Sequence, residues 1–230
     1  MSASLWQWRL WAGSLEIVAP LLPARWHIGR RAANHWRQQG DPSAPPVQPG
    51  FVNAHFAAII QAQALFNWLR RASPRQINNY ITRHVRMEAS PAVRTLLSGD
   101  DGLILSTPHF GPFAVGCVFF LQNLASRRFN LFYDSPDRNP YNADFEPTFR
   151  KIQPQINILG NDRRALVAAI KALRSGEVLT MMPDVVHDVG DAMAVRFMNR
   201  LTRAMPGTAF FALTAPAPII PVYCRITHWV

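Results

Sequence analysis

From residue 103 onward the chain alternates short apolar runs with helical stretches, and this alternation limits the fold more than any other feature of the sequence. The runs LILS (103–106), NLFY (130–133), INIL (156–159) and VLTMM (178–182) have the length of buried strands. Strands that are joined by helices run parallel, with the helices covering the faces of the sheet. We therefore predict an α/β fold with a mostly parallel central sheet flanked by helices.

Further strands and helices complete the expected domain. VRFM (195–198) and PIIPVYCR (218–225) have strand-like composition. Apolar residues recur at helical spacing in the remaining stretches, which we expect to be helices over 51–70, 75–87, 112–126, 163–175 and 208–214.

The first forty residues differ from the rest of the chain. They hold five of the seven tryptophans, and residues 1–100 hold eleven arginines against four acidic residues. Tryptophan prefers the headgroup level of a bilayer, and arginine is attracted to anionic lipid. We expect 1–40 to be an interfacial helical segment, 41–50 a proline-rich linker, and 51–230 one α/β domain. The alternative for 1–40 is an ordinary helix packed on that domain.

The N-terminal segment is expected to lie on the membrane rather than to span it. The uncharged run between Glu16 and Arg25 is short and is interrupted by Pro20 and Pro23. Two other uncharged stretches, 102–126 and 205–224, contain prolines and glycines and are expected to form buried core.

The net charge of +10 comes almost wholly from arginine, since the chain has only two lysines. Guanidinium groups bind phosphate and carboxylate in two places at once, so phosphate- or carboxylate-bearing partners are expected. The arginines are dispersed and no nucleic-acid-binding motif accompanies them, so we expect no nucleic-acid partner. Cys117 and Cys224 are too few for a disulfide scaffold, and no zinc-binding motif is present.

Two residues that follow expected strands could carry chemistry. His109 follows LILS in the sequence STPHFGPF, and Asp184 follows VLTMM in TMMPDVV. Ligands of parallel α/β sheets bind at the carboxyl ends of strands, where a histidine can act as a general base and an aspartate can orient it. Either residue could equally be structural. Arginines that could bind an anion follow later in the chain: Arg127, Arg128, Arg138, Arg163, Arg164, Arg196, Arg200 and Arg203.

The order of these segments resembles a known family. STPHFGPF, FYDSPDRNPYNADF, LRSGEVLTMMPD and VRFMNRLTRAMPGTAFFALTAPAPIIPVYCR are similar to the bacterial lauroyl/myristoyl acyltransferases of lipid A synthesis, over roughly 51–225. The resemblance implies acyl transfer from acyl carrier protein or coenzyme A to a hydroxyl of a membrane glycolipid or phospholipid, without a cofactor. It also implies a location on the cytoplasmic face of the inner membrane, where anionic lipid would be a further partner.

The resemblance assigns roles to individual residues. His109 aligns with the histidine of the family's H-x-x-x-x-acid motif and would take the proton of the acceptor hydroxyl, with Asp184 as the strand-end acid. The glycine of the family's third block matches Gly207, and the proline of its last strand matches Pro221. The residues expected to contact substrate are Phe110, Gly111, Tyr133, Arg138, Asn139, Arg163, Arg164, Arg200 and Gly207.

The chain departs from the family at one position that matters for catalysis. Ala114 stands five residues after His109, where the family has an acid. Either Asp184 or Asp188 would have to replace that acid in an active enzyme. The other hypothesis is a pseudoenzyme that keeps the fold and binds a lipid or a partner protein. The chain also ends soon after its last expected strand, so we expect a shortened relative.

Overall fold

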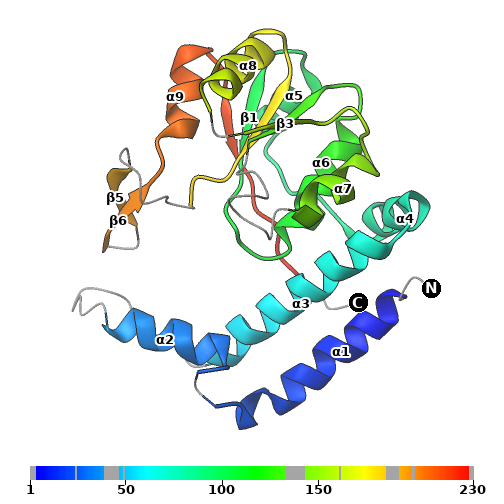
Figure 1. The fold of residues 1–230 in the computed structure, drawn as a ribbon, viewed down its shortest axis with the longest axis vertical. Helices are drawn as coiled ribbons and strands as arrows, with labels where there is room; N and C mark the ends of the chain where they lie inside the picture. Colours follow the sequence, from blue (N-terminus) through cyan, green and yellow to red (C-terminus); the bar gives the residue numbers. More distant parts are fainter. Residues whose placement is uncertain are drawn as a thin grey trace.

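A five-stranded parallel sheet lies at the centre of the computed structural model, in the order β3-β2-β4-β1-β7 (Figure 1). Neighbouring strands are parallel throughout this sheet, so the predicted fold class is confirmed. The structure describes residues 4–23, 25–38, 47–48, 50–132, 143–160, 162–184, 192–197 and 200–227. The five strands are β1 (Leu103–Ser106), β2 (Phe129–Phe132), β3 (Asn157–Leu159), β4 (Val178–Met181) and β7 (Ile219–Pro221).

Helices cover both faces of the sheet because its side chains alternate between two apolar clusters. In β1, Leu103 and Leu105 belong to the cluster that includes α6 (Phe113–Asn123), whereas Ile104 packs into a second cluster with α8 (Arg163–Arg174) and α9 (Gly207–Thr214). A strand buried on both faces needs such a continuous apolar run, since successive side chains point in opposite directions. The helices α4 (Pro74–His84), α5 (Pro91–Ser98) and α7 (Phe145–Arg150) complete the α/β domain.

One expected strand of the sheet lies elsewhere. The first three residues of the run VRFM fall in β5 (Met193–Phe197), and Met198 lies outside the described residues. Strand β5 pairs antiparallel with β6 (Arg200–Ala204) in a separate two-stranded hairpin. Met193 and Phe197 are exposed there, whereas the three central strands of the main sheet, β1, β2 and β4, are almost wholly buried. A short apolar run does not by itself distinguish a buried strand from an exposed one.

The N-terminal segment packs against α3 (Phe51–Arg71). Its elements are α1 (Leu5–Val18), a 3-10 turn (Ala19–Leu21) and α2 (Ile28–Gln38). Gln61 of α3 donates a hydrogen bond to Glu16 of α1 at 2.8 Å, and the guanidinium of Arg71 lies over the Trp8 ring. The segment is therefore docked on the domain. Most of the predicted linker, 41–50, lies outside the described residues. In the part of the chain that is described, no helix is long and apolar enough to cross a bilayer.

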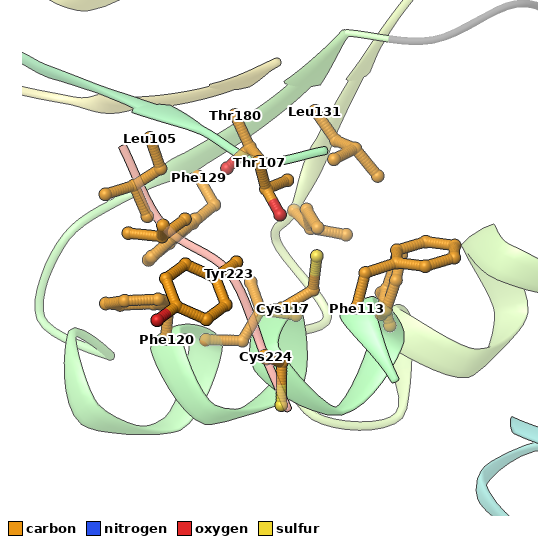
Figure 2. Close-up of a pocket in the computed structure, with 15 residues that line it drawn as sticks. Leu105, Thr107, Phe113, Cys117, Phe120, Phe129, Leu131, Thr180, Tyr223 and Cys224 are labelled. Atoms are coloured by element: carbon orange, nitrogen blue, oxygen red, sulfur yellow. The ribbon is translucent and has the colours of Figure 1, made fainter. Parts of the chain in front are cut away.

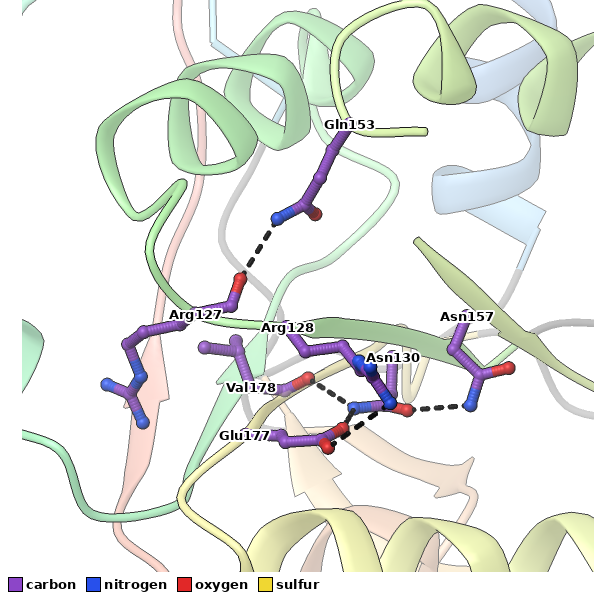
Figure 3. A network of polar contacts seen from close by, with 7 residues as sticks. All are labelled: Arg127, Arg128, Asn130, Gln153, Asn157, Glu177 and Val178. Atoms are coloured by element: carbon purple, nitrogen blue, oxygen red, sulfur yellow. Dashed lines mark hydrogen bonds and ion pairs between the residues drawn. The ribbon is translucent and has the colours of Figure 1, made fainter. Parts of the chain in front are cut away.

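A polar network stabilises the edge of the sheet where its strands begin (Figure 3). The amide of Asn130, which is completely buried, donates to Glu177 at 2.7 Å and accepts from Asn157 at 2.9 Å. The buried guanidinium of Arg127 donates to the carbonyls of Asp101 and Gly176. Asp101, Arg127 and Glu177 precede β1, β2 and β4, whereas Asn130 lies in β2 and Asn157 begins β3. The network therefore joins four strands near the edge opposite their carboxyl ends.

We predict that Asn130→Ala lowers the free energy of unfolding by about 1–3 kcal/mol, because the partners of a buried amide lose their hydrogen bonds. Urea denaturation measures the change. The matched control is Asn123→Ala, at an exposed position of α6, which is expected to lower the free energy of unfolding by under about 1 kcal/mol. Equal stability of the two variants would show that the network contributes nothing.

Candidate active site

The pairing of β1 with β4 places His109 and Asp184 side by side. Ser106 pairs with Met181 at the carboxyl ends of the two strands, and His109 and Asp184 each follow three residues later. The Thr107 amide also donates to the Met181 carbonyl at 2.9 Å, which extends the pairing beyond the strands. Two residues that lie 75 positions apart in the chain are thus brought to the same point on the sheet edge.

The carboxylate of Asp184 holds His109 in two places. Its Oδ2 accepts a hydrogen bond of 2.7 Å from the backbone amide of His109, and its Oδ1 lies 3.0 Å from the ring Nδ1. The second contact orients the ring when Nδ1 carries the proton, which leaves Nε2 free to accept one. Both side chains are about 40% exposed, so substrate can reach them.

Asp184 is suited to remain ionised in this position. Partial burial acts to raise its pKa, but hydrogen bonds from the ring and the backbone of His109, together with the charge of the ring, outweigh that effect. The pKa of Asp184 is therefore lowered from its ordinary value. The carboxylate is charged at neutral pH, and its hold on His109 weakens only as the pH falls through this lowered pKa.

The turn that carries His109 depends on a glycine. Gly111 has a φ of 59°, and a side chain there would collide with the Cys224 carbonyl. Residues after β7 therefore run directly against the turn. Phe110 meets the Tyr223 ring edge-on at 6.0 Å between centroids, which fixes this part of the chain beside the site.

Two helices begin close to the His109–Asp184 pair. α6 starts at Phe113 without a side-chain cap, because Pro112 precedes it. α9 starts at Gly207, where an added Cβ would lie 3.0 Å from Met181 at the end of β4. The predicted glycine is thus close to the site, and its lack of a side chain allows α9 to approach β4.

An apolar cavity of about 40 Å³ lies between the sheet and α6 (Figure 2). Phe113 forms part of its wall and also packs edge-on against the His109 ring at 5.1 Å. Cys117 and Phe120 extend from α6 toward the strands, and Leu131 faces them from β2.

A larger groove of about 480 Å³ adjoins the cavity on the other side of residues 222–224. Leu65, Val93, Leu97 and Phe119 contribute to an apolar lining, and Arg86, Glu88 and Arg225 are among its polar residues. The groove and the cavity share walls at Gly116, Phe120, Val222, Tyr223 and Cys224. Its volume falls in the range of ligand sites, about 300–1,000 Å³. The sequence did not reveal this groove, because its walls come from separate helices and from the segment after β7.

The family's motif acid has no counterpart at Ala114, whose side chain is buried in the core beside Val115 and Val118. A carboxylate at this position would enter an apolar cluster. The contact to His109 comes instead from Asp184, one of the two aspartates considered above.

The other predicted residues divide into three groups. Arg163 and Arg164 are exposed at the start of α8, beyond β3 and thus on the same edge as the pair but at the end of the sheet. Arg127 and Arg128 lie at the opposite edge. Tyr133, Arg138, Asn139 and Asp188, with the side chain of Arg200, fall outside the described residues.

Neither thiol is placed to react. Burial raises the pKa of Cys117 to about 12 and that of Cys224 to about 11. A thiol is nucleophilic only as the thiolate, so both stay inert at neutral pH. Across the described ranges, no group of three or more histidine, cysteine, aspartate or glutamate residues could hold a metal ion.

An α/β domain with an oriented histidine at its strand ends and apolar space beside it can combine a general base with an apolar ligand. The family model of bacterial lipid A biosynthesis acyltransferases matches residues 51–228. The chain belongs to this family, which confirms the resemblance in its segments. No curated protein matches the chain.

Proposed function

We propose that this protein transfers a fatty acyl chain from a thioester, on acyl carrier protein or coenzyme A, to a hydroxyl of a membrane lipid such as a lipid A precursor. The observation that carries the proposal is the double contact between Asp184 and His109. A carboxylate that accepts a hydrogen bond from Nδ1 keeps the proton on that nitrogen. Nε2 then stays unprotonated and can act as the base.

The proposed reaction uses His109 as the base and Asp184 as its partner. His109 Nε2 takes the proton of the acceptor hydroxyl while the oxygen attacks the thioester carbonyl. The tetrahedral intermediate collapses, the carbon–sulfur bond breaks, and the imidazolium returns the proton to the leaving thiolate. Asp184 stabilises the imidazolium and remains ionised throughout. No covalent enzyme intermediate forms.

The amino end of α6 supports the intermediate electrostatically. Helix α6 begins four residues after His109, and Pro112 provides no side chain to cap its first amides. The amides of Phe113 and Val115 already donate to the carbonyls of Gly111 and Pro112. The positive end of the helix dipole is therefore what stabilises a developing oxyanion.

The apolar groove is proposed to hold the acyl chain, with the adjoining cavity as an extension of the same space. Its walls begin at Pro112, next to the His109 turn, and continue to Val93 and Leu97 of α5. Apolar chains bind such a groove because water leaves both surfaces. The length of the groove between Pro112 and α5 would then set the length of the acyl chain that the enzyme prefers.

The N-terminal helix is proposed to lie on the cytoplasmic face of the inner membrane, where the acceptor lipid is found. Trp6, Leu10 and Ile17 of α1 are 58, 60 and 80% exposed, and their spacing places them on one helical face. Figure 1 shows α1 on the side of α3 that faces away from the sheet. Such an apolar stripe, followed by exposed Trp26 and Arg25, fits an interfacial helix.

We predict that His109→Ala abolishes acyl transfer and that Asp184→Asn lowers kcat by roughly 10²–10⁴-fold, since the wrong tautomer would then be favoured. The double variant should be no slower than His109→Ala, because the residues act as one unit. Transfer of a radiolabelled acyl chain from acyl carrier protein measures these effects, with Asp100→Asn at the far sheet edge as the control. Undiminished turnover in His109→Ala would refute the assignment, and no turnover in the unaltered protein would establish the pseudoenzyme.

We predict that Val93→Trp shifts donor preference toward shorter acyl chains, with kcat/KM for long chains reduced at least about tenfold and short chains spared. Val167→Trp, at an exposed position of α8, is the matched control. Competition between thioesters of different length gives the preference directly. An unchanged preference would mean that the chain lies outside this groove.

We predict that Trp6→Ser/Leu10→Ser/Ile17→Ser weakens binding to anionic vesicles by at least about tenfold, because three exposed apolar side chains no longer enter the interface. Vesicle flotation measures the bound fraction. Retention of full binding would assign membrane contact to another part of the chain.

A further inference from the structure

The hairpin of β5 and β6 stands apart from the main sheet, beside α9 (Figure 1). Its two strands pair from Met193 with Ala204 to Phe197 with Arg200. Met193, Phe197 and Leu201 are 56, 64 and 75% exposed, and the side chains of Arg196 and Arg203 are exposed as well. The described part of the hairpin therefore has little support from the rest of the protein.

Apolar side chains lie on both faces of this ribbon. Directly paired residues of antiparallel strands share a face, and successive residues alternate between faces. Met193, Val195 and Phe197 thus occupy one face, whereas Leu201 lies on the other with Arg196. Phe197 and Leu201 belong to the last two pairs of the described register, so the apolar groups of the two faces converge at that end of the ribbon.

An isolated two-stranded ribbon is marginally stable in water unless another surface covers it. The chemistry of that surface follows from the sequence of the hairpin. Residues 192–204 contain Arg196, Arg200 and Arg203 and no acidic residue. Among the described residues, neither Arg196 nor Arg203 has an acidic partner. The complementary surface is therefore anionic and apolar.

We propose that the end of the β5–β6 hairpin that carries Phe197 and Leu201 inserts into the headgroup region of an anionic bilayer, as a membrane contact separate from α1. A protein partner would cover one face of the ribbon, whereas a bilayer surrounds both, which matches the positions of Phe197 and Leu201. Arginines that flank an apolar tip pair with lipid phosphates at the same depth.

The inserted hairpin would hold the active site close to the lipid surface. Directly after β6, the Met205 amide donates to the Pro183 carbonyl at 3.4 Å, next to Asp184. The base of the hairpin is thus bonded to the turn that carries the acid. This inference extends the proposed function by assigning a membrane orientation to the same site.

The test uses the full chain with Leu201→Cys, labelled with a fluorophore that shifts to the blue in apolar surroundings. Burial raises the pKa of both native thiols, which slows their alkylation relative to an exposed thiol. The unaltered protein, carried through the same labelling, measures the remaining background, so the difference reports position 201. Val167→Cys on α8 is the matched control. Vesicles of phosphatidylcholine with phosphatidylglycerol are expected to shift the emission of the label at 201 to the blue and to leave the label at 167 unchanged. Brominated lipid in the same vesicles should quench the fluorescence of the label at 201. Pure phosphatidylcholine vesicles should bind at least about fivefold more weakly.

Other outcomes overturn the inference. If the protein floats with vesicles but the label at 201 does not shift, α1 alone makes the membrane contact. If acidic acyl carrier protein shifts the label and vesicles do not, the hairpin binds a protein. Phe197→Ser/Leu201→Ser should also lower transfer to vesicle-embedded acceptor at least about tenfold while leaving transfer to detergent-solubilised acceptor unchanged. If the substitutions abolish transfer to both acceptors, the hairpin has a structural role instead. If the unaltered protein transfers to neither acceptor, the proposed function itself is refuted, separately from this inference.

Discussion

The parallel pairing of β1 with β4 is the constraint on which the candidate site depends. The register aligns Ser106 with Met181, and the backbone bond from Thr107 to Met181 continues that alignment past the strand ends. His109 and Asp184 then meet without any long side chain having to bridge a gap. A slip of one residue in the register would send every side chain of β1 to the opposite face of the sheet. Leu103, Ile104 and Leu105 are at most 1% exposed, so a slip would exchange side chains of different shape between two closely packed clusters. The same packing that stabilises the core therefore also assembles the pair.

The contact between Asp184 and His109 uses both carboxylate oxygens, and this explains how the chain can lack the motif acid. One oxygen fixes the backbone of the turn, and the other orients the ring. An acid on α6 would have to reach back from a helix whose corresponding position, Ala114, is packed in the core. In this protein the orienting carboxylate comes from the neighbouring strand. The site thereby keeps the chemistry of a held histidine while the helix contributes apolar packing and its amino end.

The proposed membrane contacts share one physical cause. The first helix and the β5–β6 hairpin each expose apolar side chains that the folded domain leaves uncovered, with arginines nearby. Soluble proteins seldom leave contiguous apolar surface in water unless a partner covers it. The domain therefore combines a core that helices cover on both faces of the sheet with two projecting elements. The apolar side chains of these two elements are left for an apolar surface outside the protein to cover. That division fits an enzyme whose acceptor stays in a bilayer.

Sequence periodicity was sufficient to predict the parallel sheet, its five strands and three of the four helices between them, because each depends on local spacing of apolar residues. It missed the short helix α7 between β2 and β3. It also placed His109 and Asp184 after strands. It failed for β5, whose apolar run looks the same whether a sheet or solvent surrounds it. The sequence by itself thus determined the fold class and the residues at the strand ends. Only the tertiary structure decided which acid meets His109, that α1 docks on α3, and where the groove lies, because strand order and helix packing bring together residues that no local pattern relates.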